Sequence, residues 1–120
     1  MENKMIFTAE EKSFIIEADG KKLRVSYDEF NGNHNNAMEF CKKQGGGEET
    51  VENLRFLARH RDAINAELKK LGKELISGWY WANEITWWSD DFAFVVSTRY
   101  GNVYYGDRHI NYSARAVSAL

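Results

Sequence analysis

The chain has 120 residues, 43% of them hydrophobic and 28% charged, which predicts a single domain over residues 1–120 with one buried core. With one cysteine, Cys41, an internal disulfide is excluded, and we expect that thiol to be a small buried apolar group. The net charge of −2, without a cluster of basic residues, argues against nucleic acid as a partner. The amino terminus has no apolar run typical of a signal peptide or membrane span, so we expect a cytoplasmic protein without a membrane partner, or one carried by a virion.

The first pattern along the chain predicts a β-hairpin. Two short apolar stretches between residues 13 and 27 flank Asp19-Gly20, a strong turn signal. On the return arm Leu23, Val25 and Tyr27 alternate with polar residues, which is typical of a half-buried strand. We interpret residues 1–30 as an amino-terminal hairpin extension.

Residues 31–72 predict the helices. A polar loop over residues 31–36 ends in a helix cap, an apolar helical pattern follows, and glycines 45–47 end it. Thr50 is placed to cap a further helical stretch that ends before Gly72. Because Asp62 has the character of a second cap, this stretch predicts two consecutive helices or one kinked helix. His60 lies among charged residues, and we expect it on the surface.

From Gly78 onward the apolar period changes to two, which indicates strands. Residues 92–96 are continuously apolar, as in a strand buried on both faces, a turn over residues 100–102 follows, and residues 114–119 predict a final strand. The overall order indicates an α+β fold. The large rings assigned to its core are Trp79, Trp81, Phe92 and Phe94.

The carboxy-terminal third contains more rings than a core of this size needs, and two of its loops have the composition of a binding site. Adjacent indoles cannot easily both be buried on one face of a loop, and tyrosine supplies contact area at low entropic cost. The alternative is that one indole fills the core while the other shields it, and that some tyrosines only pack the sheet. The candidate ligand-binding residues are Trp87, Trp88, Asp90, Tyr104, Tyr105, Asp107, His109 and Tyr112.

Catalytic and metal-binding patterns are missing from the sequence. His34, His60 and His109 lack metal-ligand spacing, and no nucleophile elbow or Cys/His arrangement is present. The carboxylates of the two loops have the right chemistry for calcium, but a solvated acidic loop is the simpler interpretation. We therefore expect a protein that is not an enzyme, with no cofactor and no bound metal.

The order of elements and several motifs resemble the DUF1566 family of C-type-lectin-like domains. The resemblance covers residues 33–120. It rests on Gly78-Trp-Tyr-Trp-Ala-Asn-Glu, with Trp81 and Glu84 at its motif positions, on the Gly101-Asn-Val turn, and on Arg115 and Val117 in the last strand. The family's Trp-Arg-Leu-Pro-Thr stretch is replaced by Gly47-Glu-Glu-Thr-Val, and its last-strand proline by Ala116. The resemblance implies two helices packed on a small antiparallel sheet with an aromatic-rich loop region, over residues 31–120.

The resemblance also implies a function. Some relatives are variable proteins of diversity-generating retroelements, which display a ligand-binding face built from mutable asparagine codons. Tyr104, Tyr105, Asp107, His109 and Tyr112 are residue types that such codons reach, and Trp87 is not. We expect a ligand-binding module for a protein or a glycan. The alternative is a structural subunit, phage- or prophage-associated, that uses the same surface to form a homo-oligomer.

Overall fold

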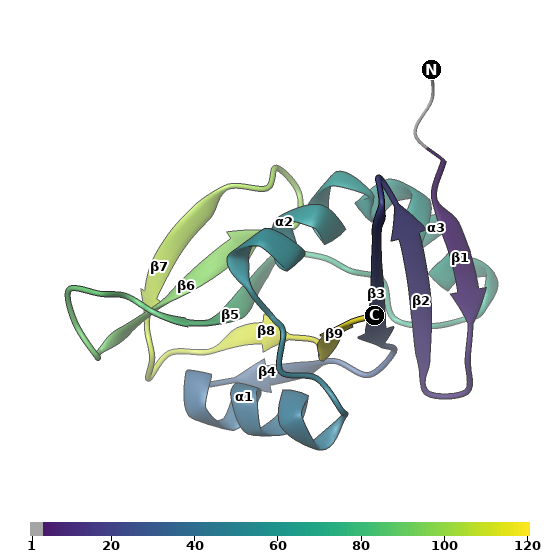
Figure 1. Cartoon of the computed structure of the whole chain (residues 1–120). Coiled ribbons are helices and arrows are strands. Elements are labelled where there is room, and N and C mark those ends of the chain that lie inside the picture. The colour runs from purple at the N-terminus through teal and green to yellow at the C-terminus, as the bar shows by residue number, and fades with distance from the viewer. Residues whose placement is uncertain (1–3) are drawn as a thin grey trace.

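Two β-sheets and three helices make up the computed structural model, which describes residues 4–120 (Figure 1). Sheet A has the order β1-β2-β3-β9, and sheet B has the order β4-β8-β5-β6-β7. The fold is therefore α+β, with three helices and two mostly antiparallel sheets. The resemblance implied two helices on one small antiparallel sheet preceded by a hairpin, whereas the residue pattern had left a third helix open. The strands are β1 (Ile6–Ala9), β2 (Ser13–Ala18), β3 (Lys21–Ser26), β4 (Phe30–Gly32), β5 (Trp79–Ile85), β6 (Phe92–Ser97), β7 (Val103–Asp107), β8 (Tyr112–Ala114) and β9 (Val117–Ala119).

The hairpin turn forms where the sequence predicted it. Asp19 and Gly20 have φ angles of 53° and 75°, the left-handed conformation that a tight two-residue hairpin turn requires. Strand β1, which the sequence pattern did not predict, pairs with β2, and β3 pairs with the carboxy-terminal strand β9. The amino-terminal strands are thus joined to the last strand of the chain. The first three residues of the predicted extension lie outside the described residues.

The three helices are α1 (His34–Lys43), α2 (Val51–Arg59) and α3 (Arg61–Lys70). Thr50 caps α2 as predicted, its hydroxyl accepting from the Asn53 N–H. Helix α1 starts earlier than predicted, because the side chain of Asn33 caps it and β4 occupies the start of the expected loop. The break between α2 and α3 falls at His60, which has no side-chain cap bond there, so the predicted Asp62 cap is wrong and Asp62 lies in the first turn of α3.

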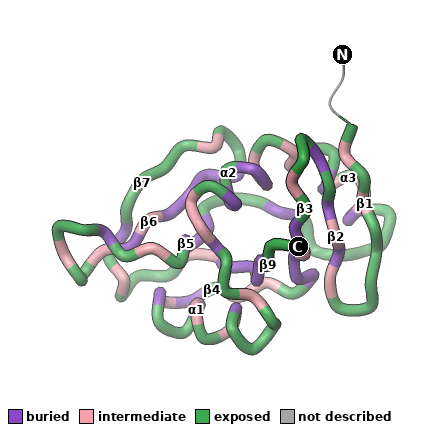
Figure 2. The backbone as a smooth tube through the Cα atoms, viewed as in Figure 1, coloured by how far each residue is buried: buried purple, intermediate pink, exposed green. Residues whose placement is uncertain are grey.

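Sheet B is covered on both faces near its middle. Alternate residues of a strand point to opposite faces, so Trp81 and Val95 pack with Cys41 of α1, while Tyr80 and Val96 pack with Leu54 of α2. The cluster that contains Leu54 continues into sheet A and α3. Cys41 is fully buried as expected, and burial raises the pKa of its thiol. Figure 2 shows buried residues on the inner strands and helices, and exposed residues along β1, β7 and the loop that joins β5 and β6.

The assignment of rings to the core was only partly correct. Trp81 is fully buried, but Trp79 is exposed at the start of β5, and Phe92 and Phe94 are only half-buried. The alternation of residues along β5 predicted that only one face of this strand is buried, whereas Tyr80, Trp81 and Ala82 are all buried. The assignment of His60 to the surface was also wrong, because its ring packs on Phe56 and lies beside the Asp19 carboxylate.

The predicted final strand is two strands in different sheets. Strand β8 pairs with β4 in sheet B, and β9 pairs with β3 in sheet A, with Arg115 and Ala116 between them. Arg115 is 1% exposed, and its Nε donates to the Glu29 carboxylate at 2.9 Å. Its Nη2 donates to the Glu74 carbonyl at 2.6 Å, and the Tyr80 hydroxyl donates to the same Glu29 oxygen. The chain therefore crosses from one sheet to the other around a buried ion pair.

Arg115→Met is expected to lower the free energy of unfolding by about 3 kcal/mol, because it leaves the Glu29 carboxylate, which is only 12% exposed, without its cationic partner. Urea denaturation monitored by tryptophan fluorescence measures the change. The control is Arg61→Met, which removes the partly exposed Arg61–Asp62 pair and is expected to cost no more than about 1 kcal/mol. Equal losses in the two variants would contradict a special role for Arg115.

Candidate functional site

Six rings form a continuous group at the outer end of sheet B, which we call the aromatic cluster. The rings of Trp87 and Trp88 meet edge to face with centroids 4.8 Å apart, and each lies 5.9 Å from the ring of Phe94. Trp88 also contacts Tyr105 at 5.2 Å, and Tyr104 stacks on Tyr105 at 4.9 Å. The sixth member is Phe92, 5.6 Å from Tyr105.

Strand register and loop bonds place these rings. Phe94 of β6 lies directly opposite Tyr105 of β7, so both side chains leave the same face of the sheet. The indoles come from the loop between β5 and β6. At its start the Thr86 N–H donates to the Phe92 carbonyl and the Thr86 hydroxyl donates to the Ser89 carbonyl.

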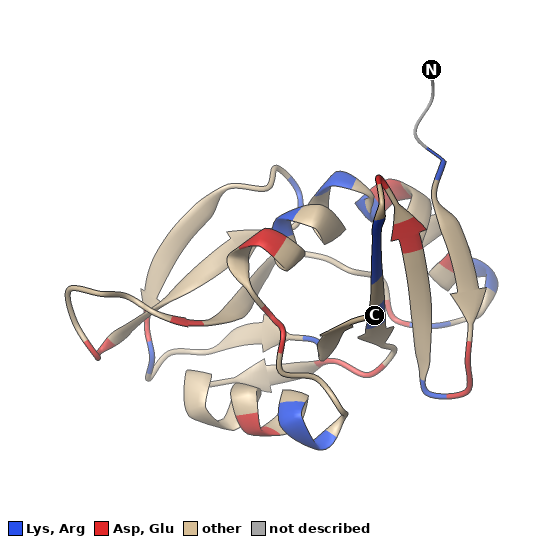
Figure 3. Ribbon diagram, viewed as in Figure 1, with Lys and Arg blue, Asp and Glu red and all other residues tan. Residues whose placement is uncertain are grey.

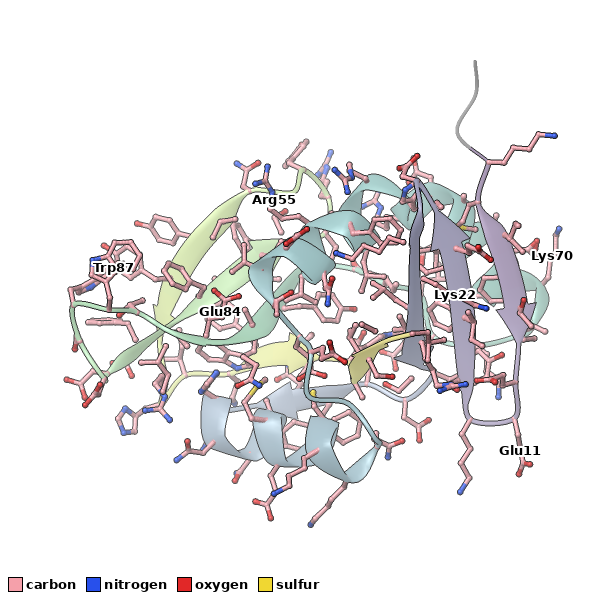
Figure 4. All side chains as sticks on the ribbon, in the orientation of Figure 1. Glu11, Lys22, Arg55, Lys70, Glu84 and Trp87 are labelled. Atoms are coloured by element: carbon pink, nitrogen blue, oxygen red, sulfur yellow. The ribbon has the colours of Figure 1, made fainter. Side chains whose placement is uncertain are left out.

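Four of the predicted site residues in this cluster are exposed. Trp87 is 85% exposed, Trp88 47%, Tyr104 60% and Tyr105 40%. The alternative in which one indole fills the core while the other shields it therefore does not describe this structure. Figure 4 shows Trp87 at the far end of the molecule, away from both sheet A and α3.

A polar pocket of about 260 Å³ lies beside the carboxyl end of the same loop. It brings together Asp90 and His109, which the sequence predicted, with four residues that it did not. The lining residues are Asn33, Asn35, Asp90, Asp91, Arg108 and His109. These residues come from the start of α1, the β5–β6 loop and the β7–β8 turn, which only the folded chain brings together.

Arg108 holds this pocket in place, and the sequence analysis did not select it. Its Nη1 donates to the Asp90 carbonyl at 2.8 Å, and its Nη2 donates to the Asn35 side chain at 2.6 Å. Its Nε points to the Nδ1 of His34 at 3.2 Å, while the His34 Nε2 lies 2.9 Å from the Ala82 carbonyl. Because a carbonyl only accepts, the Nε2 of His34 carries the proton and Nδ1 accepts from Arg108. His34 is thus a neutral positioning residue.

Burial and the nearby Arg108 charge lower the pKa of His34, against the opposing effect of its bond to Ala82. No sequence signal marked this histidine, since its partners are 48 and 74 residues away.

Asp107 and His109 form a local unit at the β7–β8 turn. The Asp107 carboxylate accepts from the His109 N–H at 2.8 Å and lies 2.9 Å from the His109 ring. The His109 backbone bond, followed by its ring, lowers the pKa of the Asp107 carboxyl. Both side chains are exposed, so the unit shapes the turn while leaving the imidazole open to solvent.

Tyr112 is separated from the exposed surface. Its ring meets Trp81 edge to face at 4.9 Å and lies under Gly106, where a Cβ would come within 2.6 Å of it. The residue is half-buried and packs against the α1 side of sheet B. Tyr112 therefore supports the strand that carries Tyr104 and Tyr105, and the sheet-packing alternative describes it.

Within residues 4–120, no group of three or more His, Cys, Asp or Glu side chains is arranged to hold a metal ion. No helix among those residues has the length and apolar character needed to cross a membrane. Comparison with protein-family models, with curated proteins and with solved structures finds no match to the chain. The function is accordingly argued from the site itself.

His34→Gln is expected to reduce the loss of stability in mild acid. Because the folded pKa of His34 lies below its ordinary value of about 6.5, the unfolded chain takes up more protons, and the free energy of unfolding falls as the pH drops through about 6.5. Above that pH the group makes no such contribution. Urea denaturation between about pH 7.5 and about pH 5.5 measures the slope.

The buried Glu49 carboxyl works in the opposite direction, since burial raises its pKa and its contribution is lost as the pH rises. It is present in both proteins, so the difference between wild type and His34→Gln isolates the histidine. His109→Gln, at an exposed position, is the matched control. A wild-type slope retained in full by His34→Gln would contradict the assignment.

Proposed function

We propose that the chain is a non-enzymatic ligand-binding module that presents the aromatic cluster to a protein or a glycan. The observation that carries this proposal is the contiguity of six rings at one end of sheet B, four of them exposed. Contiguous exposed apolar area of this kind usually marks a contact surface.

The setting of the rings supports binding rather than chance exposure. Phe94 and Tyr105 stand on paired strands, and bonds at both ends of the β5–β6 loop fix the segment that carries Trp87 and Trp88. A surface held in advance loses little conformational entropy when a ligand binds. Stacking on rings, with hydrogen bonds from neighbouring polar groups, suits both sugars and protein side chains.

We also propose that the chain has a C-type-lectin-like architecture, as the resemblance to the DUF1566 family implies. Helices α1 and α2 precede the aromatic strands and pack on opposite faces of an antiparallel sheet, which supports this assignment. The exposed Tyr104, Tyr105, Asp107 and His109 stand at positions where variation would leave the core unchanged.

Trp87→Ala is expected to weaken ligand binding about tenfold or more, because removing a central ring from an interface commonly costs over 1 kcal/mol. The probes are a glycan array and a library of random displayed peptides, with affinities of the selected probes measured by fluorescence polarisation. Since Trp87 is 85% exposed, the stability of the variant should change by no more than about 0.5 kcal/mol. Ile6→Ala, at an exposed apolar position on β1, is the control, and equal binding by both variants would refute the proposal.

Homo-oligomer formation is the second candidate function, and the position of β7 favours it. Strand β7 is the edge of sheet B and is uncovered on its outer side (Figure 1). The Ser97 N–H donates to the Asn102 carbonyl, and the Arg108 N–H donates to the Asp91 carbonyl. Because bonded residues alternate along an antiparallel strand, these two bonds show which residues of β7 direct their backbone groups toward β6. The backbone groups of Val103 and Tyr105 therefore point away from β6, so the edge offers donors and acceptors to another strand. A phage- or prophage-associated assembly would use this edge together with the cluster.

Val103→Lys is expected to abolish self-association if β7 is the assembly edge, because an outward lysine is a common device against edge pairing. Light scattering coupled to size-exclusion chromatography measures the mass of wild type and variant. Ile6→Lys places the same charge on β1, the free edge of sheet A, and serves as the control. A wild-type protein that is monomeric at high concentration would remove this candidate and leave the ligand-binding proposal standing.

A further inference from the structure

We propose that the ligand is an acidic segment of a partner protein, held between the aromatic cluster and three arginines of α2 and the β6–β7 turn. This inference rests on the proposed function, because it names the ligand of the same surface. The arginines are Arg55, Arg59 and Arg99.

The aromatic cluster and α2 share one face of sheet B. Glu84 of β5 lies on the same face as Phe94 of β6, and Phe94 lies opposite Tyr105 of β7, so the three side chains form a row across the sheet. The Glu84 carboxylate accepts from the Val51 N–H at the start of α2, at 3.0 Å. A pocket of about 440 Å³ opens at this junction, between Glu84 and the α2 residues Arg55 and Arg59. The row therefore leads from the pocket to the rings.

The turn between β6 and β7 brings a third arginine to the same side. A Cβ placed on Gly101 would lie 4.0 Å from the Cβ of Ala58, so the turn packs against α2. Arg99, which lies over the Tyr100 ring, is in this turn. Figure 3 shows the basic positions of α2 and of this turn gathered along one border of sheet B. The strands that run from this border toward the β5–β6 loop carry few charges (Figure 3).

The arginines and the acids of this surface differ in whether they have partners. No carboxylate forms an ion pair with Arg55, Arg59 or Arg99 within the part of the chain that the structure describes, and all three side chains are exposed. The nearby acids do have partners. Glu52 lies 3.5 Å from the Lys21 ammonium, and Glu84 is bonded to the first turn of α2. Glu52, which also lines the pocket, is offset by Lys21, and the Glu84 carboxylate keeps its charge because its partner is a backbone N–H. The three arginines outweigh that single acid, so the balance beside the rings is positive.

A peptide that alternates acidic and large apolar residues fits this arrangement. Guanidinium groups pair with carboxylates in a bidentate geometry, and the rings offer apolar area next to them. Nucleic acid fits less well, because its phosphates recur along the whole strand and would meet Asp90 and Asp91 at the other end of the β5–β6 loop. A neutral glycan would use the rings and leave the arginines without a partner. The combination of both features points to an acidic protein segment.

Selection from a displayed library of random peptides of about 12 residues tests the inference, with the full chain as bait. The variant Arg55→Glu/Arg59→Glu reverses the charge of the pocket. The control Lys22→Glu/Lys70→Glu makes the same change in net charge at the opposite end of the molecule, where Figure 4 labels both lysines. We expect wild type and control to enrich peptides with Asp or Glu beside large apolar residues. We expect the pocket variant to bind a synthetic consensus peptide at least about tenfold more weakly, a cost of about 1.4 kcal/mol.

The outcomes separate this inference from the function on which it rests. If Trp87→Ala abolishes binding of the selected peptides and the pocket variant does not, the cluster binds ligands but the acidic specificity is wrong. If neither change matters, both fail. Selected peptides without acidic residues, no enrichment over the empty support, or tighter binding of a single-stranded oligothymidylate than of the consensus peptide would each overturn the inference. Affinity that falls as salt rises, in wild type and not in the pocket variant, would support it.

Discussion

The buried ion pair between Arg115 and Glu29 is the constraint on which the arrangement of the two sheets depends. Arg115 lies at the point where the chain leaves sheet B and enters sheet A, and its guanidinium also bonds to the Glu74 carbonyl before β5. A buried charge without its partner is costly, so the strand break, the position of Glu29 and the connection into β5 must form together. The Tyr80 hydroxyl, bonded to the same carboxylate, links this network to the middle of sheet B.

This arrangement leaves one part of sheet B uncovered. Helices α1 and α2 bury the faces of β5 and of the inner positions of β6, and sheet A with α3 occupies the other end of the molecule. Strand β7 is the edge of that sheet, and four of its five residues are exposed. Rings that would be core residues on an inner strand, such as Tyr104 and Tyr105, are therefore surface residues on this one. The site is a consequence of where the layers of the fold end.

The sequence predicted those features that depend on local chemistry. The Asp19-Gly20 turn and the Thr50 cap each follow from a few neighbouring residues, and each is confirmed. Of the two alternatives left open for Trp87 and Trp88, the structure shows the exposed one. The errors arise where distant segments decide the outcome. Tyr80, Trp81 and Ala82 are all buried because helices cover both faces of their strand, and residues 114–119 divide between two sheets because of Arg115. Arg108 and His34 could not be selected from the sequence for the same reason, since their roles exist only once α1, the β5–β6 loop and the β7–β8 turn meet.

The exposed rings and the groups that hold the β5–β6 loop have different roles. The rings form the surface, and the bonds at the two ends of the loop support it. The ring contacts of Trp87 are with Trp88 and the half-buried Phe94, and that of Tyr104 is with Tyr105, so neither ring is part of the buried core. The backbone beneath them is fixed by Thr86 at one end and by Arg108, through Asp90, at the other. Arg108 in turn depends on a neutral His34, which is tied to the Ala82 carbonyl in the centre of sheet B. Under the proposed function, a change of ring would alter the ligand that is recognised, whereas a change at His34 or Arg108 would alter the geometry of the whole proposed binding surface at once.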